Sequence, residues 1–328
     1  MLLPIVLLLV GFGILIKGAD FLVNGASSLA KKYGISNLAI GLTVVAFGTS
    51  MPELIVSVIA SLGGKNDAAF GNIIGSNNFN LLFILGICGL IYPLVVQRNT
   101  VKYEVPLSLL AAVLLFVIVN DVMLWGAAEN SMSRFDAIIL LIFFGLFMFY
   151  IYRTMKTTGD VGSDEGDPIK IYTPLVSSGM AFLGLVMLIG GGKLVVDNAV
   201  EIAKSFGLSE KLIGLTILAI GTSLPELATS AVAAYRRNTD IAIGNVIGSN
   251  IFNIFFILGI AGTIRETPFN AAMNFDLYVL MGSTVVLMIF MFTLNTRKLD
   301  RWEAALMLLG YFAYTAFLIG MENGSITL

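Results

Sequence analysis

Long apolar stretches separated by short polar segments dominate the chain. A helix needs about 20 predominantly apolar residues to cross a bilayer, and within lipid its backbone polar groups must be satisfied internally. We therefore interpret these stretches as transmembrane helices and not as barrel strands. The pattern predicts ten spans, at residues 2–30, 36–62, 69–92, 104–120, 134–152, 174–203, 210–235, 241–263, 274–294 and 302–321.

The distribution of lysine and arginine predicts which loops face the cytoplasm. With the amino terminus outside, twelve of the 19 basic residues fall in inner loops and five in outer loops, while Lys17 and Lys193 lie within spans. This bias predicts a cell-membrane protein with both termini outside. Residues 154–173 then form a short cytoplasmic linker between a first five-helix repeat at 1–153 and a second at 174–328.

The two halves share a duplicated segment. Residues 41–86 align without gaps to 214–259, an offset of 173 residues, and 26 of the 46 positions are identical. Because the offset contains five spans, an odd number, the second copy must cross the membrane in the opposite sense to the first. The sequence therefore predicts an all-α polytopic membrane protein with two inverted five-helix repeats, which suits a substrate site that opens alternately to each side.

The composition agrees with a membrane protein and excludes several classes of function. Hydrophobic residues make up 57% of the chain and charged residues 12%, with a mean hydropathy of +0.92. A net charge of −2 provides no basic surface for nucleic acid. The chain has no histidine and one cysteine, Cys88, which excludes disulfides, thiolate metal sites and histidine-based catalysis.

Each copy of the repeat carries a glutamate in the middle of an apolar span. Glu53 lies in GTSMPEL at 48–54, and Glu226 lies in GTSLPEL at 221–227. The proline of each motif should kink or unwind its helix, and an ionisable residue at membrane depth is a functional-site hypothesis by default. No lysine or arginine lies within two helical turns of either glutamate, so their counter-charge must come from elsewhere.

Two aspartates within spans have basic residues nearby. Asp20 follows Lys17 by three positions and Asp197 follows Lys193 by four, the spacings at which side chains meet on a helix surface. We expect both to form structural ion pairs.

Oxygen-bearing side chains accompany the glutamates at helical spacing. They form stripes on the same span as each glutamate and on the span that follows. On the glutamate-bearing span the stripe is Thr49, Ser50 and Ser57, repeated as Thr222, Ser223 and Ser230. On the span that follows it is Asn72, Ser76 and Asn80, repeated as Asn245, Ser249 and Asn253. Such stripes also serve interhelical hydrogen bonding with close packing, here through Gly71, Gly75, Gly244 and Gly248, and we expect both roles.

The collected donors predict the kind of ion. Carboxylate, hydroxyl, amide and carbonyl oxygens without nitrogen or sulfur ligands favour hard cations such as Ca²⁺ or Na⁺. The two glutamates carry a charge of about −2, which one Ca²⁺ or two Na⁺ neutralise. Competition for the same carboxylates would couple the two ions and produce antiport.

The paired GTSxPE and GNxxGSN segments closely resemble the alpha repeats of the calcium/cation antiporter superfamily, which includes the sodium/calcium exchangers. The resemblance covers the whole ten-span layout, and both copies carry both motifs. It implies alternating access, in which the first and sixth helices slide against a rigid remainder. It also implies that Glu53 and Glu226 are the central ligands, with further oxygens from Thr49, Thr222, Ser50, Ser223, Ser76, Ser249, Asn80, Asn253 and the backbones of Ala46 and Ala219.

One position departs from that pattern. Well-studied sodium/calcium exchangers often have an aspartate where this chain has Asn253, so both matching positions, Asn80 and Asn253, are amides here. The negative charge of the site is lower by one, which bears on the number of sodium ions and on the driving ion.

We expect a secondary antiporter that exports Ca²⁺ against Na⁺ entry, without enzyme activity or a cofactor. An H⁺-coupled or K⁺-dependent antiporter is the alternative, because a buried carboxyl group can hold a proton in place of a metal. A cation channel is less favoured since no pore segment is evident, and an intramembrane enzyme is least favoured. The expected partners are Ca²⁺, Na⁺ and the lipid bilayer, and the oligomeric state is open, a monomer included.

Overall fold

A computed structural model describes residues 2–64, 66–155, 170–205, 219–293 and 297–322. In these ranges the chain is almost entirely helical, as its apolar pattern predicts. Eight helical stretches are long and apolar enough to span a membrane, and the pair Asn37–Thr49 and Met51–Leu62, bent by 48°, is compatible with a ninth. The expected span at 210–235 and the linker at 154–173 lie partly outside the described residues, so the count of ten spans stays a prediction.

The first half of the chain contains long helices interrupted by π-helical segments. Its helices are α1 (Leu2–Tyr33), α2 (Asn37–Ile40), η1 (Gly41–Val45), α3 (Ala46–Thr49), α4 (Met51–Leu62), α5 (Asn66–Asn78), η2 (Phe79–Ile84), α6 (Leu85–Ile91), η3 (Thr100–Glu104), α7 (Val105–Val119), α8 (Asp121–Trp125) and α9 (Arg134–Thr154).

The second half repeats this order where the structure describes it. Its helices are α10 (Pro174–Ser205), α12 (Ala219–Gly221), α13 (Leu224–Tyr235), α14 (Thr239–Ile251), η5 (Phe252–Leu258), α15 (Gly259–Ile264), η6 (Ala271–Met273), α16 (Asn274–Phe290) and α17 (Arg301–Glu322).

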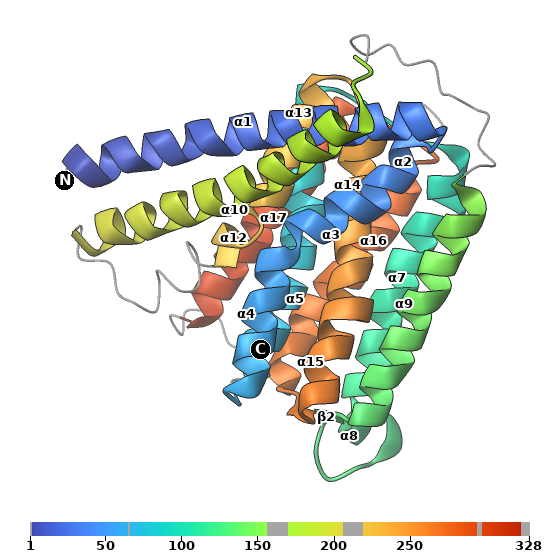
Figure 1. The fold of residues 1–328 in the computed structure, drawn as a ribbon. Helices are drawn as coiled ribbons and strands as arrows, with labels where there is room; N and C mark the ends of the chain where they lie inside the picture. The colour runs from blue at the N-terminus through green and yellow to red at the C-terminus, as the bar shows by residue number, and fades with distance from the viewer. Residues whose placement is uncertain (1, 65, 156–169, 206–218, 294–296, 323–328) are drawn as a thin grey trace.

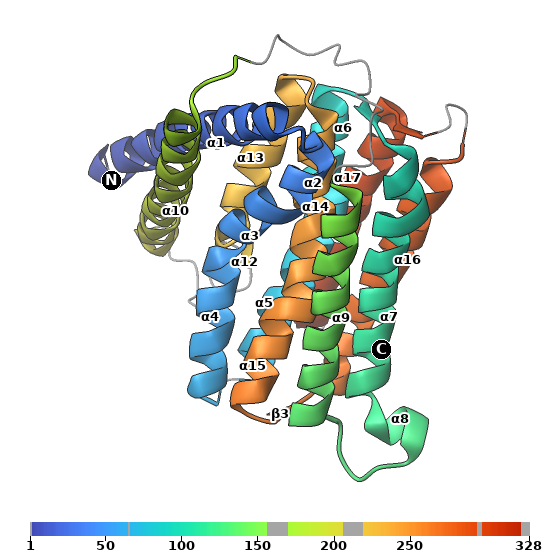
Figure 2. The same cartoon turned by 45° about the vertical axis from the view of Figure 1, so that its right-hand side comes forward.

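Helices α1 and α10 lie side by side and cross the other helices steeply, and one end of each projects beyond the bundle (Figures 1 and 2). They run antiparallel with glycines at the seam. A Cβ on Gly18 would meet the Gly184 carbonyl at 2.9 Å, and one on Gly191 would meet the Gly11 carbonyl at 3.1 Å. Glycine lets two helix backbones approach this closely, so α1 and α10 pack as one tight pair.

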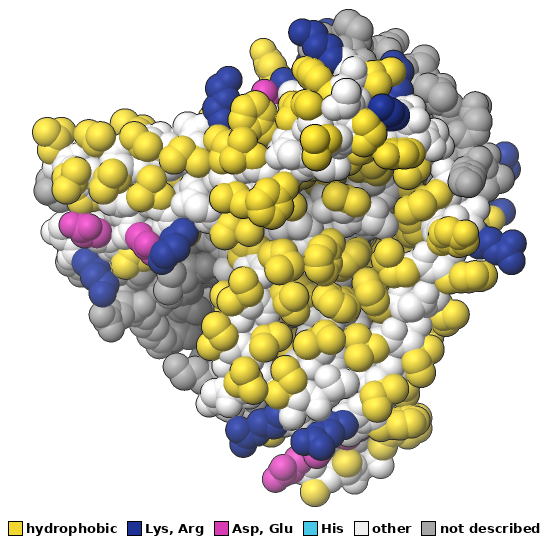
Figure 3. All heavy atoms as spheres, viewed as in Figure 1, with side chains coloured by type: hydrophobic (Ala, Val, Ile, Leu, Met, Phe, Trp, Pro, Cys, Tyr) yellow, Lys and Arg dark blue, Asp and Glu magenta, His cyan; other side chains and the backbone are white. Residues whose placement is uncertain are grey.

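The remaining helices form a bundle whose surface suits lipid. On the face shown in Figure 3, hydrophobic side chains cover the middle of the bundle, and lysines and arginines gather at its upper and lower margins. Lysines and arginines at the edges of an apolar band are compatible with a membrane-spanning bundle, because their long side chains near helix ends reach out of the hydrocarbon.

Two short β-ladders join loops at the helix ends, a feature that the all-α prediction did not include. Strand β1 (Leu94–Val95) pairs antiparallel with β4 (Lys298–Leu299), and β2 (Ser131–Met132) pairs antiparallel with β3 (Thr267–Pro268). Two-residue strands carry no detectable alternation in sequence, which explains the omission. Each ladder joins two loops that the predicted topology places on the same side of the membrane.

Candidate functional site

The span that contains Glu53 is broken at the predicted place. The π-helix η1 leads into α3, the chain bends at Ser50 (φ −81°, ψ 8°), and α4 begins with Pro52 in its first turn. Ser223 has nearly the same conformation (φ −90°, ψ 8°) before α13, with Pro225 in its first turn. Proline is tolerated in the first turn because the N–H that it lacks has no intrahelical partner there, so both motifs start a new helix at this depth.

The two glutamates are buried in the first turns of these new helices. Glu53 in α4 and Glu226 in α13 are each 1% exposed. A carboxylate in the first turn is stabilised by the positive end of the helix dipole. Among the described residues neither glutamate forms an ion pair, so the expectation that they lack a basic partner agrees with the structure.

Each glutamate accepts a hydrogen bond from one serine of the other repeat. The Ser50 hydroxyl lies 2.8 Å from Glu226 Oε1 and 3.0 Å from the Ser249 hydroxyl. In the same way the Ser223 hydroxyl lies 3.0 Å from Glu53 Oε1 and 3.0 Å from the hydroxyl of Ser76. These reciprocal contacts bring both glutamates and the four predicted serines into one buried cluster.

The second predicted stripe contains a feature that the sequence did not reveal. Asn80 lies in the π-helix η2 and Asn253 lies in η5, and the two π-helices begin 173 residues apart. Such π-bulges are rare and occur frequently at functional sites because they redirect side chains. The same bulge in both copies places both asparagines one helical turn beyond Ser76 and Ser249.

Asn77 and Asn250 hold these two asparagines in place. Asn80 Nδ2 donates to Asn250 Oδ1 at 3.0 Å, and Asn253 Nδ2 donates to Asn77 Oδ1 at 2.9 Å. Asn77 and Asn250 also donate to each other's backbone carbonyls, at 3.2 Å and 3.3 Å. Neither residue of this pair was among the predicted site residues, although both belong to the duplicated GSN motif.

Four oxygens of the cluster lack hydrogen-bond partners among the described residues. They are Glu53 Oε2, Glu226 Oε2, Asn80 Oδ1 and Asn253 Oδ1, which form two pairs at the repeat offset. An unsatisfied buried acceptor costs about 1–3 kcal/mol, and more when it is charged. The elements that carry them contact one another, α4 with η5 and α13 with η2, and all four oxygens can accept from or coordinate a group with positive charge.

The predicted threonines support the cluster from its edge. Thr49 Oγ1 lies 3.1 Å from Asn245 Oδ1, and Thr222 Oγ1 donates to Asn72 Oδ1 at 3.3 Å. The amides of those asparagines donate in turn to Ser230 at 2.9 Å and to Ser57 at 3.1 Å. The Thr, Ser and Asn stripes therefore form interhelical hydrogen bonds, which is one of the two roles expected of them.

The resemblance implies two backbone carbonyl oxygens as ion ligands, and the structure describes the surroundings of only one of them. The Ala46 carbonyl accepts the Ser50 N–H at 3.0 Å and lies 3.3 Å from Thr49 Oγ1, so both of its lone pairs have donors nearby. Ala219 is the first residue of α12, and the segment before it lies outside the described residues.

The glycines of the GNxxGSN motif differ between the copies. A Cβ on Gly248 would meet Leu42 Cα at 2.9 Å, and one on Gly244 would meet the Leu38 carbonyl at 3.0 Å, whereas Gly71 and Gly75 have no described atom within 4 Å. The close packing expected of all four is present in the second copy. The segment equivalent to 38–46 is 211–219, which is almost wholly outside the described residues.

The expected partner of Asp20 was wrong. Asp20 pairs with Arg236, whose guanidinium also donates to Asn24, and Lys17 is exposed. The arginine lies 216 residues away in the chain, beyond the reach of helical spacing. The other expected pair is present, with Lys193 Nζ 3.0 Å from Asp197 Oδ2.

The fold and the cluster together define a polytopic membrane protein with a buried site of oxygen donors. In the described part of the chain, no three or more His, Cys, Asp or Glu side chains are arranged so that they could hold a metal ion by themselves. Hard cations suit carboxylate, amide and hydroxyl oxygens better than transition metals do.

Comparison with known proteins shows the family to which this membrane protein belongs. The sodium/calcium exchanger protein family matches residues 3–153 and 176–320, so the chain belongs to this family. It is 38% identical to the putative antiporter CaxA of Alkalimonas amylolytica over 320 residues, which cover 96% of this chain and 98% of that one. It is 30% identical to the sodium/calcium exchanger MaX1 of Methanosarcina acetivorans, covering 95% of this chain and 97% of that one.

A solved structure has the same fold. The sodium-calcium exchanger NCX_Mj soaked with 10 mM Na⁺ and 10 mM Sr²⁺ matches with a TM-score of 0.80 and 33% identity, covering 96% of this chain and 98% of the other. The resemblance seen in the paired motifs is thereby confirmed, and the chain is a multi-pass membrane transporter of the cation antiporter class.

Proposed function

We propose that this protein exchanges Ca²⁺ for Na⁺ across the cell membrane, with the ions held between Glu53 and Glu226. The observation that carries the proposal is the set of four unpartnered oxygens on Glu53, Glu226, Asn80 and Asn253. One Ca²⁺ satisfies all four and neutralises both carboxylates, because Ca²⁺ accepts six to eight oxygens in flexible geometry. The serine hydroxyls of residues 50, 76, 223 and 249 complete the shell.

Alternating access follows from the arrangement of the two repeats. The ten-span, twofold-inverted organisation at residues 1–153 and 174–328, joined by a cytoplasmic linker at 154–173, would expose the same site to either side. Both termini would lie outside. The α1–α10 pair packs on α13 and on the segment before Glu53, so movement of this pair is our proposed gate.

Reconstituted protein tests the exchange directly. An imposed Na⁺ gradient should drive ⁴⁵Ca²⁺ into proteoliposomes, and Glu53→Gln and Glu226→Gln should each abolish the uptake. Glu129→Gln, at an exposed loop position, is the matched control and should transport like the parent protein. Parent-like uptake by either site variant would refute the proposal.

Two other arms of this assay address the alternatives. Ca²⁺ uptake driven by a pH gradient without Na⁺ would favour H⁺ coupling, and uptake that requires K⁺ as well as Na⁺ would favour the K⁺-dependent form. Currents far above carrier turnover in a planar bilayer would indicate a channel.

A further inference from the structure

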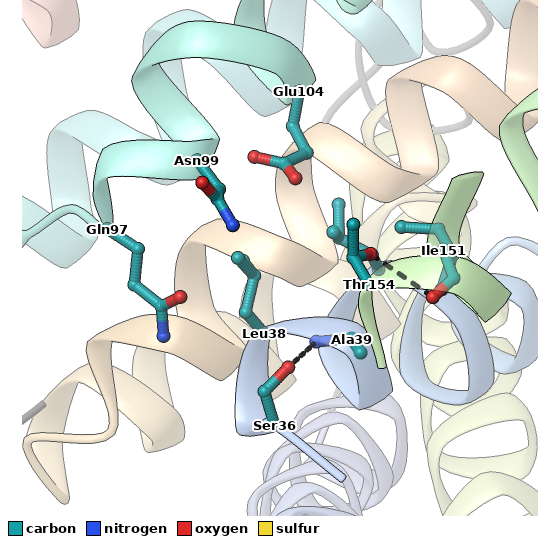
Figure 4. Close-up of a pocket in the computed structure, with 9 residues that line it drawn as sticks. Ser36, Leu38, Ala39, Gln97, Asn99, Glu104, Ile151 and Thr154 are labelled. Atoms are coloured by element: carbon teal, nitrogen blue, oxygen red, sulfur yellow. Dashed lines mark hydrogen bonds between the residues drawn. The ribbon is translucent and has the colours of Figure 1, made fainter. Parts of the chain in front are cut away.

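A polar cavity, distinct from the Glu53–Glu226 cluster, lies at the helix ends that the predicted topology assigns to the cytoplasm (Figure 4). Polar side chains from three separate segments line it: Ser36, Gln97, Asn99, Glu104 and Thr154. Its volume is about 10 Å³, which suffices for about one water-sized particle. None of these residues belongs to the Glu53–Glu226 cluster.

Glu104 is a buried residue of the cavity wall, and only one of its two carboxylate oxygens has a hydrogen-bond partner among the described residues. It is 2% exposed, and its Oε1 accepts a hydrogen bond from the Tyr150 hydroxyl at 2.5 Å, while Oε2 has no partner among the described residues. No described lysine or arginine forms an ion pair with it. A buried charge without a partner is strongly unfavourable, so Glu104 requires either a cation or a proton.

The surroundings of Glu104 favour a cation. Figure 4 shows Glu104 and Asn99 projecting from one side of the cavity toward Leu38 and Thr154 on the other. Gln97 Nε2 donates to Asp240 Oδ2 at 2.6 Å, so this amide offers its Oε1 to the cavity, while Asp240 lies outside the lining and is held by Gln97. The available donors are thus carboxylate, amide and hydroxyl oxygens, which hard cations prefer.

We infer that this cavity is a second cation site, separate from the transport site, and that it binds one Na⁺ from the cytoplasm. One carboxylate within the cavity matches one positive charge, and the space accommodates one ion without its hydration shell. The second repeat has a related carboxylate, Asp276 in the first turn of α16, which accepts a hydrogen bond from the Tyr314 hydroxyl at 2.6 Å as Glu104 does from Tyr150. Asp276 does not line this cavity. The proposed site therefore lies on the side that the predicted topology assigns to the cytoplasm.

The cavity is connected to the transport site through the broken span. Leu38, Ala39 and Leu42 line it and belong to α2 and η1, which continue into α3 and Ser50. Ser36 is the N-cap of α2, and the remaining lining residues are on α9 and on the segment that leads into α7. A bound Na⁺ would tie the start of the broken span to the rigid bundle and so make exchange depend on cytoplasmic Na⁺.

Equilibrium binding of ²²Na⁺ to purified full-length protein tests the inference. The background is the Glu53→Gln/Glu226→Gln double variant, which removes both transport-site charges. It should retain saturable binding of about one Na⁺ per chain, as the cavity size allows. Adding Glu104→Gln should abolish this binding, and adding Glu129→Gln should not. Absence of saturable binding in the double variant, or its survival in Glu104→Gln, would overturn the inference.

A second variant and a second readout guard against misfolding. Asn99→Ala leaves the Tyr150–Glu104 bond in place and should weaken ²²Na⁺ binding by about 10-fold, the loss of roughly one hydrogen-bond equivalent. In choline medium, adding Glu104→Gln to the Glu53→Gln/Glu226→Gln double variant should not lower its melting temperature, and only the double variant with Glu104 intact should gain thermal stability with added Na⁺. Equal Na⁺-induced gains in both would also overturn the inference. Because the binding assay requires no transport, failure of the exchange proposal would not affect its outcome.

Discussion

At each central glutamate a serine holds one carboxylate oxygen, and the other oxygen has no hydrogen-bond partner among the residues that the structure describes. Ser223 holds Oε1 of Glu53, and Ser50 holds Oε1 of Glu226, which orients the two unpartnered Oε2 atoms. A hydroxyl can donate to a carboxylate and still accept from or coordinate a cation. The serines therefore serve both as positioning groups and as ligands in our proposal.

Asn77 and Asn250 should control affinity without touching the ion. Asn77→Ala removes the acceptor that orients Asn253, and Asn250→Ala does the same for Asn80. Loss of such a bond costs about 1.4 kcal/mol, so we predict about a 10-fold rise in the Ca²⁺ concentration for half-maximal exchange. Asn274→Ala removes an amide that bonds Asn120 instead, and it should leave this concentration unchanged. Equal effects of all three variants would contradict the assignment.

Asn253 should determine the charge balance of the cycle. Asn253→Asp adds one carboxylate beside Glu53 and Glu226, and the extra negative charge calls for additional Na⁺ in the competing state. We predict a higher Hill coefficient for Na⁺ or a changed current per Ca²⁺, measured in voltage-clamped proteoliposomes. If neither quantity changes, this position does not set the ion ratio.

Among the helices, α1 and α10 pack closely because glycines at their contact have no side chain. A Cβ on Gly184 would meet the Leu22 amide nitrogen at 2.6 Å and the Gly18 carbonyl at 2.7 Å. Both contacts are with backbone, which cannot turn aside as a side chain can.

Gly184→Ala should therefore destabilise the protein. Overpacking of this kind costs about 1–3 kcal/mol, and we predict a lower melting temperature in detergent. Gly179→Ala on the same helix has no described atom within 4 Å, and it should melt at the same temperature or higher, because alanine favours helix over glycine. A common shift for both variants would argue against the tight seam.

The sequence could predict those features that are determined by residues close together in the chain. The spans follow from composition because lipid requires long apolar helices, and Glu53 and Glu226 stand out because carboxylates are rare at that depth. The π-bulges at Asn80 and Asn253 leave no compositional mark, since they change only the hydrogen-bond ladder. The Asp20–Arg236 pair and the Glu104 cavity join segments far apart in the chain, which helical spacing cannot foresee.

At the scale of the whole molecule, the contacts divide the protein into the α1–α10 pair and the bundle that holds the site. Within the pair, the Ser28 and Ser177 hydroxyl oxygens are 2.8 Å apart. Between the pair and the bundle, Asn238 Nδ2 donates to Ser27 Oγ at 3.1 Å. These two contacts allow the proposed motion to be tested with matched cross-links.

Disulfides at the two contacts should have opposite effects on exchange. In a Cys88→Ala background, Ser28→Cys/Ser177→Cys should transport normally when oxidised, because it links two helices that move together. Ser27→Cys/Asn238→Cys should lose transport on oxidation and regain it on reduction, because it locks the pair to the bundle. Full activity of the second oxidised variant would contradict the proposed motion.

The proposed function requires one divalent cation between Glu53 and Glu226, and anomalous diffraction from crystals soaked in Sr²⁺ or Ca²⁺ would locate this ion. We predict a peak at about 2.3–2.6 Å from oxygens of both glutamates, flanked by Asn80 and Asn253, and lost in Glu226→Gln. A peak that touches neither glutamate, or carboxylates each paired to a basic residue with no peak between them, would contradict it.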